Sequence, residues 1–330
     1  MGERKWHKHY AKGVGANIRF KNEFLQDQLE RNARQTPDKA GLIYNDAKIT
    51  YSELNNAANR FANALLKMGI KKGDRVALIM PNIPQFVMAA YGVWKTGAAV
   101  VPHNPMYTDP ELKSQLNNSG CKIVVALDLL TDRIVNLRNE THVEKIIVTK
   151  LTDYPEPVNA KEANQNNGKI DGVYEWMDLQ QNNTVTDTKM DLDIDSLCLL
   201  MFTGGTTGVS KGVILSHRNF SIMVEIFTSW FTPLHSGEVV AIGSIPFFHV
   251  YGLGASMMSC VQRGWTNVLI PRPDALAIMQ AIHKYKARYI PTVPTIFYGV
   301  MNHPDLEKYE LSSIDVCLSG AAPLSARAEA

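Results

Sequence analysis

Apolar runs of strand length alternate with helical patterns along most of this sequence, and this alternation limits the chain to few fold classes. The first clear unit begins at residue 49, where a short apolar run leads into an amphipathic segment. Its apolar residues recur every three or four positions, as one face of a helix requires: Leu54, Ala58, Phe61, Leu65 and Met68. Gly69 stands where a helix C-cap is expected, and the apolar run 75–80 predicts the next strand.

The alternation then continues with short turns between the elements. A helix is predicted after Pro84, followed by a strand over 98–102. Further helix and strand patterns cover 112–120, 121–127 and 144–149. Because the strands are almost continuously apolar, the pattern predicts an α/β fold in which helices cover both faces of a mostly parallel sheet.

The composition changes between residues 151 and 195, where Asn, Gln, Asp, Thr and Lys predominate around the short segment 173–179. Such a stretch buries little apolar surface, so we expect a surface excursion that joins two α/β subdomains. We place these subdomains at 1–190 and 191–330, and the second resumes the strand and helix pattern.

Bulk composition is that of an ordinary globular protein. The 330 residues are 45% hydrophobic and 20% charged, and the net charge of +2 gives no reason to expect a nucleic-acid partner. One basic block stands out, RKWHKHYAK at 4–12, which is either a solvated chain end or a docking site for anionic lipid or a partner. No apolar core follows these charges, so we expect no signal peptide.

The four cysteines, Cys121, Cys198, Cys260 and Cys317, are far apart and show no C-x-x-C spacing. Cys198 and Cys317 lie inside apolar runs. Buried free thiols are therefore expected, which fits a reducing, cytoplasmic location.

Residues 239–262 contain no Asp, Glu, Lys or Arg and are long enough to span a bilayer. Several helix-breaking or polar residues interrupt this run: Gly243, Pro246, His249, Gly252 and Gly254. A strand, a bend and a buried helix explain the pattern better than a transmembrane segment does. Peripheral contact with a membrane stays open.

The loop TGGTTGVSKG at 203–212 follows an apolar strand pattern and precedes another apolar segment. Its glycines leave backbone N–H groups free to surround phosphate oxygens, and Lys211 adds a mobile cation for a polyphosphate. Further hydrogen-bond donors come from four hydroxyl side chains: Thr203, Thr206, Thr207 and Ser210. A glycine-rich turn with incidental threonines is the alternative without a function. A Walker A loop would need glycine before the lysine and a hydroxyl after it, whereas Ser210 and Gly212 stand there, so a phosphotransferase is the weaker alternative.

The loop closely resembles the signature of the adenylate-forming enzymes, which include acyl-CoA synthetases, luciferases and the adenylation domains of peptide synthetases. It departs from that signature at Gly204, where serine is usual, and at Ser210, where proline is usual. Other segments resemble this family in the same order, and together they cover nearly the whole chain: 49–78, 94–108, 244–254 and 317–325. The pattern is most similar to the N-terminal region of the long-chain fatty-acid–CoA ligases, which implies two stacked, mostly parallel sheets with helices on their faces.

The resemblance assigns site residues to three segments. The ATP phosphates would lie against Thr203, Gly204, Gly205, Thr206, Thr207, Gly208 and Lys211. The adenine would lie against Ser319, Gly320, Ala321, Ala322 and Pro323, and the acid substrate against Phe248, His249, Tyr251, Gly252 and Gly254. No metal ligand is expected among these 330 residues.

The implied reaction uses ATP, Mg²⁺ and coenzyme A to convert a carboxylic acid, through an acyl-adenylate and pyrophosphate, to an acyl-CoA. Phe248 stands where amino-acid-activating relatives place an aspartate, which favours an acid without an α-amine. Gly252 and Gly254 either leave room for an alkyl chain or allow close helix packing. A medium- or long-chain fatty acid is the expected substrate. The alternatives are an aryl or other acid, and a nucleotide- or acyl-binding module without turnover.

Later motifs of the family do not occur in these residues: the magnesium-binding glutamate, the aspartate on the ribose, the hinge and the lysine of the C-terminal lid domain. We therefore expect an N-terminal portion that folds around its sheets and has little or no synthetase activity on its own. The resemblance also allows a homodimer.

Overall fold

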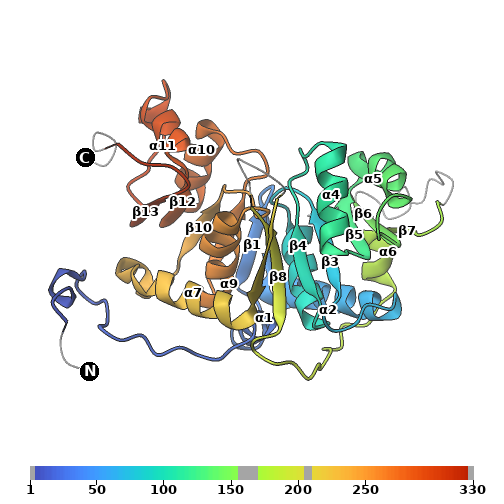
Figure 1. The fold of residues 1–330 in the computed structure, drawn as a ribbon. Coiled ribbons are helices and arrows are strands. Elements are labelled where there is room, and N and C mark those ends of the chain that lie inside the picture. The colour runs from blue at the N-terminus through green and yellow to red at the C-terminus, as the bar shows by residue number, and fades with distance from the viewer. Residues whose placement is uncertain (1–3, 155–169, 204–209, 326–330) are drawn as a thin grey trace.

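The computed structural model describes residues 4–154, 170–203 and 210–325, which form two mostly parallel sheets with helices packed on them (Figure 1). This confirms the predicted α/β class. The first sheet has the order β13 (Val316–Ser319), β12 (Tyr289–Thr292), β10 (Val240–Gly243), β11 (Thr266–Leu269), β1 (Ala40–Tyr44), β2 (Ala47–Thr50). The second has the order β7 (Val173–Glu175), β6 (Lys145–Thr149), β5 (Ile123–Leu127), β3 (Arg75–Ile79), β4 (Ala99–Pro102), β8 (Leu197–Phe202), β9 (Gly212–Ser216).

Each sheet ends in one antiparallel edge strand, since β2 pairs with β1 and β9 with β8, while the other pairings are parallel. Each sheet also combines strands from both halves of the chain. The early strand β1 pairs with β11, and β4 pairs with β8. The segments 1–190 and 191–330 therefore share both sheets.

The helices lie between and around these strands (Figure 1). Those of six or more residues are α1 (Leu25–Gln35), α2 (Tyr51–Lys67), α3 (Pro84–Lys95), α4 (Asp109–Ser119), α5 (Thr131–Arg138), α6 (Trp176–Gln181), α7 (His217–Ser229), η4 (Leu253–Met258), α10 (Ala275–Tyr285) and α11 (Pro294–Met301). The shorter helices α8 (Val250–Gly252) and α9 (Ser259–Arg263) flank η4 without a break.

The predicted amphipathic helix is α2. A capping box starts it, in which the Thr50 side chain accepts from the Glu53 backbone N–H and the Glu53 carboxylate accepts from the Thr50 backbone N–H. Gly69 has φ +93°, a left-handed conformation that glycine adopts without strain, and it ends the helix as expected. The periodic residues Leu54 and Phe61 are fully buried.

Helix α3 is buried along its whole length and belongs to a core cluster that also contains residues of both sheets. It packs closely on α2, because a Cβ built on Gly92 would lie 2.9 Å from the Ala58 carbonyl oxygen. The two sheets thus share one apolar core, in which a Leu, Ile, Val or Phe side chain contributes about 1.5–3 kcal/mol.

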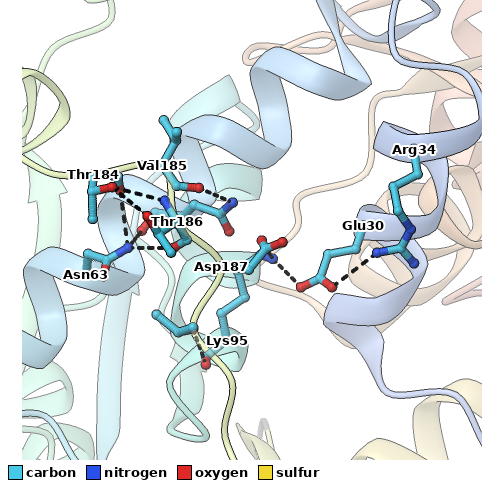
Figure 2. A network of polar contacts seen from close by, with 10 residues as sticks. Glu30, Arg34, Asn63, Lys95, Thr184, Val185, Thr186 and Asp187 are labelled. Carbon is cyan, nitrogen blue, oxygen red and sulfur yellow. Dashed lines mark hydrogen bonds and ion pairs between the residues drawn. The ribbon is translucent and has the colours of Figure 1, made fainter.

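Within the polar stretch at 151–195, the short segment 173–180 packs against the core. Strand β7 pairs with β6, and Trp176 at the start of α6 is fully buried against Phe61, with ring centroids 4.8 Å apart. Residues 184–188 lie across α2 and α3, where the Asn63 amide donates to the carbonyl oxygens of Thr184 and Thr186 at 3.2 and 2.9 Å (Figure 2). Apart from Trp176 and Gln180, the described residues 170–195 are exposed or half-buried, so this stretch is a mostly exposed connection that these contacts hold against α2 and α3.

The uncharged run 239–262 forms β10, a bend and the helical segment α8–η4–α9, which is buried from Gly252 onward, as predicted. Among the described residues, no helix combines the length and apolarity that crossing a bilayer requires.

Cys121, Cys198 and Cys260 are buried free thiols, as expected. Cys317 is exposed, which corrects the prediction of a buried thiol. The physical reason is its place on β13, the edge strand of its sheet, where one flank has no neighbouring strand among the described residues.

Candidate functional site

The carboxyl ends of β10, β12 and β13 meet at one edge of the first sheet, as parallel strands require. Ser244, directly after β10, donates a 3.4 Å hydrogen bond from its hydroxyl toward Thr292 Oγ1. The backbone N–H of Gly320, directly after β13, donates to the Thr292 carbonyl at 3.2 Å. The predicted acid segment and the predicted adenine segment both begin at this edge.

Tyr251 joins these two segments. Its hydroxyl lies 2.9 Å from the Leu318 carbonyl oxygen and 3.2 Å from that of Thr292, and it can donate to either. A Cβ built on Gly320 would lie 2.7 Å from the Tyr251 ring, so the ring packs directly on the glycine. Burial raises the pKa of Tyr251, which keeps the hydroxyl protonated as a donor.

His249 lies at the bend before α8 and is exposed, beside the half-buried Phe248 at a ring centroid distance of 4.9 Å. Partial loss of hydration lowers the pKa of His249, which favours the neutral imidazole at pH 7. A neutral ring can donate one hydrogen bond to a carboxylate without adding a fixed charge.

The two glycines of the acid segment are in close contact with their surroundings. A Cβ built on Gly252 would lie 2.3 Å from the Pro246 carbonyl oxygen, so backbone packing requires glycine there. A Cβ on Gly254 would lie 2.8 Å from Met223 Cε, the flexible end of a side chain on α7. Close packing explains Gly252, whereas the space next to Gly254 depends on the position of Met223.

The loop 203–212, which we call the phosphate loop, connects the antiparallel strands β8 and β9, and hydrogen bonds between Thr203 and Lys211 close its base. The Thr203 N–H donates to the Lys211 carbonyl at 3.0 Å, and the Lys211 N–H donates to Thr203 Oγ1 at 3.3 Å. The Ser210 hydroxyl donates to the Thr203 carbonyl at 2.5 Å, a bond that proline at this position could not make. The Lys211 side chain is exposed. The other predicted phosphate ligands, Gly204, Gly205, Thr206, Thr207 and Gly208, lie outside the described residues.

The adenine segment presents a buried donor and an exposed turn. Ser319 Oγ is buried and has no hydrogen-bond partner within the described parts of the chain, so it is available to a polar group of a bound nucleotide. Ala321 has φ +68°, an uncommon conformation for a residue with a Cβ, and Ala321, Ala322 and Pro323 are exposed. These residues therefore fit a surface that a flat base could cover.

Asn82, which the sequence analysis missed, holds the acid segment to the second sheet. It follows β3 and is buried; its amide donates to the carbonyl oxygens of Gly243 and Ile245 at 3.0 and 2.8 Å. Its side-chain oxygen accepts from the Phe247 N–H at 2.8 Å. The sequence signal that could have identified it is a polar residue three positions after a buried strand, at the edge where parallel strands bind ligands.

His103 is the second residue that was missed. It follows β4, is fully buried, and stacks on Phe202 with ring centroids 6.0 Å apart and planes 25° from parallel. Its Nδ1 lies 2.9 Å from Gln115 Oε1, while its Nε2 has no partner among the described residues. Phe202 directly precedes Thr203, so His103 supports the base of the phosphate loop.

Two cavities lie elsewhere in the described structure. One of about 470 Å³ is next to the loop base, where Phe202, Ser210 and Gly212 contribute to its wall. The other lies between β1 and α10. Neither is lined by the acid or adenine segment. No cluster of His, Cys, Asp or Glu within the described ranges could hold a metal ion.

Comparison with known proteins identifies a family and several relatives that are similar to this chain. The model of the AMP-binding enzyme family matches residues 29–330. A long-chain-fatty-acid–CoA ligase from Bacillus subtilis is 34% identical over 335 residues, covering 98% of this chain and 60% of the relative. One from Escherichia coli O6:H1 is 28% identical, covering 97% of this chain and 59% of the relative. The chain thus spans about 60% of the length of these relatives.

Solved structures share the fold. An anthranilate–CoA ligase in complex with anthranoyl-AMP superposes with a TM-score of 0.81 at 22% identity, covering 93% of this chain and 56% of that one. A long-chain-fatty-acid–CoA ligase from Archaeoglobus fulgidus superposes with a TM-score of 0.80 at 23% identity, covering 97% and 61%. At these identities the likeness concerns the arrangement of sheets and helices.

Proposed function

This chain belongs to the AMP-binding enzyme family, and we propose that it is part of an acid–CoA ligase that activates a medium- or long-chain fatty acid with ATP. The observation that carries the proposal is the contact between Tyr251 and Gly320, which brings the acid segment and the adenine segment to one sheet edge. The naming of the Bacillus subtilis and Escherichia coli relatives supports a fatty acid as the substrate.

In the proposed first step, a carboxylate oxygen attacks the α-phosphorus of ATP and the bond to pyrophosphate breaks. In the second step, the coenzyme A thiolate attacks the acyl carbon and AMP leaves. The acid and the nucleotide are both anions, so the protein must hold them together and compensate charge as it moves onto pyrophosphate.

We propose a separate role in this chemistry for each part of the site. Lys211 would bind the β- and γ-phosphates beside the loop amides, and Thr203 would position the start of the loop. His249 would donate to the carboxylate from its neutral ring, next to Phe248 and Tyr251. Ser319 and the turn 320–323 would lie against the adenine. Mg²⁺ would neutralise phosphate charge when bound, and we assign no ligand for it within these residues.

The test is product analysis of the full-length protein with ATP labelled at the α-phosphate, oleate and coenzyme A. The expected products are AMP, pyrophosphate and oleoyl-CoA, whereas formation of ADP would favour the phosphotransferase alternative. A series of acids from eight to eighteen carbons, with benzoate and cinnamate, distinguishes a fatty-acid ligase from an aryl-acid ligase. Binding of ATP or acid without any product would favour the binding module.

Lys211→Ala tests the phosphate site in the same assay. We expect a large loss of turnover and weaker ATP binding, because the mobile cation is removed, and partial recovery in Lys211→Arg. Lys48→Ala, which removes an exposed lysine on β2, is the matched control. Unchanged turnover and ATP affinity in Lys211→Ala would exclude the proposed role.

We further propose that residues 1–330 produced alone have little or no synthetase activity, since the expected ribose, magnesium and lid contacts lie in other motifs. ATP–pyrophosphate exchange at the rate of the full-length protein would contradict this. A cytoplasmic location and a homodimer, which the sequence suggested, stay predictions.

A further inference from the structure

The segment that precedes α1 is strongly basic, and the proposed ligase chemistry does not use it. Between residues 4 and 21 there is no Asp or Glu, but there are six basic side chains besides two histidines: Arg4, Lys5, Lys8, Lys12, Arg19 and Lys21. The rest of the chain contains more acidic than basic residues. The positive charge is thus concentrated in one short segment.

This segment starts beside the C-terminal end of α7 and runs along the outside of the molecule to α1 (Figure 1). Tyr10 packs on Trp230, the residue after α7, with ring centroids 4.8 Å apart. A Cβ built on Gly13 would lie 3.3 Å from Thr232 Cγ2, so the chain also lies close to the turn that follows α7. These contacts hold the basic segment against the body of the protein.

Large apolar side chains are exposed on the same segment and on the end of α7. The exposed fractions are 51% for Trp6, 46% for Phe20, 42% for Trp230 and 41% for Ile226. The Arg4 guanidinium lies 5.1 Å from the centre of the Trp6 ring. Exposed tryptophan beside lysine and arginine is the combination found where proteins meet the headgroup layer of a membrane.

We propose that residues 4–21, together with Ile226 and Trp230, form a docking surface for a bilayer that contains anionic phospholipid. The lysines and arginines would approach the lipid phosphates, and Trp6, Phe20 and Trp230 would enter the headgroup layer. A nucleic-acid partner would account for the charge, but it gives no role to the exposed Trp6 and Trp230. The only helix of residues 4–21 is the three-residue 3₁₀ turn His7–His9, which is too short to enter a groove. The proposal concerns a surface separate from the catalytic segments and does not depend on the proposed reaction.

The test is sedimentation of the protein with vesicles of phosphatidylcholine alone and with 30% phosphatidylglycerol. Binding is expected only with the anionic lipid, and it should weaken as NaCl rises from 0.05 to 0.5 M, since salt screens exposed charges. Trp fluorescence should shift to shorter wavelength on binding and become less accessible to iodide.

Two variants and one control locate the surface. Neutralising Lys5, Lys8, Lys12 and Lys21 together as K5Q/K8Q/K12Q/K21Q should weaken binding at least tenfold, because each near-surface lysine contributes about fivefold. Trp6→Ala should remove much of the fluorescence shift and weaken the binding that remains at high salt. The control K48Q/K67Q/K71Q/K189Q removes the same charge from exposed positions elsewhere and should retain most of the binding.

All of these substitutions lie outside the buried core, and circular dichroism of each variant checks that the fold is intact. Equal binding to neutral and anionic vesicles would overturn the proposal, as would an equal loss in the two lysine sets. Binding of the protein to a 20-base-pair DNA duplex, without binding to vesicles, would also overturn the proposal. The partner of the basic segment would then be a nucleic acid.

Discussion

The ring of Tyr251 occupies the space that a side chain at position 320 would need, with its Cε1 and Cζ atoms 2.7 Å from a Cβ built there. The Tyr251 hydroxyl lies 2.9 Å from the carbonyl oxygen of Leu318, two residues earlier on the same segment. One tyrosine therefore fixes the separation between the start of α8 and the end of β13.

Gly320→Ala should lower the free energy of unfolding by about 1–3 kcal/mol, because the added methyl group displaces the Tyr251 ring. Urea denaturation measures the change. Gly299→Ala is the control, since a Cβ there would lie 3.3 Å from Ala275 Cβ at its nearest contact and alanine favours the helix α11. In a Tyr251→Ala background, Gly320→Ala should no longer lower the free energy of unfolding, because the ring that the methyl group displaces is absent. If the losses of the two single variants instead add up in Y251A/G320A, the two residues are not coupled.

Asn82→Ala should be more costly, at roughly 2–4 kcal/mol, because it leaves two buried carbonyl groups and one buried N–H without the partners that Asn82 supplies. Thermal unfolding of the purified protein measures the loss. Asn302→Ala removes an exposed amide bonded to the Tyr298 carbonyl and should change stability by less than about 0.5 kcal/mol. A similar small loss in Asn82→Ala would show that the acid segment does not need this connection.

Lys95 is almost fully buried at the end of α3 and forms ion pairs with Glu30 of α1 and, at 3.3 Å, with Asp187 (Figure 2). Lys95→Met should cost about 3–5 kcal/mol, because two carboxylates lose their cation. Asp187→Asn should cost less than about 1 kcal/mol, since the Asp187 side chain is 45% exposed. Urea denaturation measures the free energy of unfolding of both variants, and Lys95→Met should show the larger loss.

Lys308→Met, which breaks the exposed pair with Asp305, is the control for Lys95→Met and should have little effect. If Asp187→Asn were as costly as Lys95→Met, the connection at 184–188 would contribute far more to stability than its exposure indicates.

Local patterns predicted several of the individual elements. The spacing of Leu54, Phe61 and Leu65 predicted α2, and Pro84 marked the first residue of α3. Strand order was not accessible in the same way, because β1 pairs with β11 more than 200 residues later and no local residue encodes that partner. The exchange of strands between the two halves of the chain follows from such distant pairings.

The same distinction between local motifs and distant contacts applies to the candidate site residues. The motifs predicted roles for Tyr251 and for residues 319–323, since the residues of each motif are contiguous in the sequence, and these roles stay predictions. Asn82 was missed because its partners lie more than 160 residues away, and Gly252 was ambiguous because only the folded chain shows the Pro246 carbonyl next to it. Cys317 was mistaken for a core residue because an apolar run does not reveal that its strand is at the sheet edge.

His103 should make stability depend on pH below about 6.5. Burial lowers the pKa of His103 to about 4, whereas a histidine in the unfolded chain titrates near its ordinary value of 6.5. Between these values the unfolded state binds more protons than the folded state, so stability is complete above pH 6.5 and falls as the pH falls toward 4. The full contribution is roughly 3 kcal/mol for one such histidine.

The measurement is the urea midpoint at pH 7.0, 6.0, 5.0 and 4.5 for the parent protein and for His103→Asn. The variant removes the titrating ring, so its stability should fall less between pH 7.0 and 4.5, although its stability at pH 7.0 is lower because the ring no longer packs on Phe202. His217 is the internal reference, since burial lowers its pKa to about 4 as well and its contribution stays in both proteins. The carboxylates that titrate near pH 4 also contribute equally to both and cancel in the difference. Identical pH profiles for the two proteins would mean that the His103 ring takes up a proton as readily in the fold as in the unfolded chain, and that it does not sit as a neutral support beneath Phe202 and the loop base.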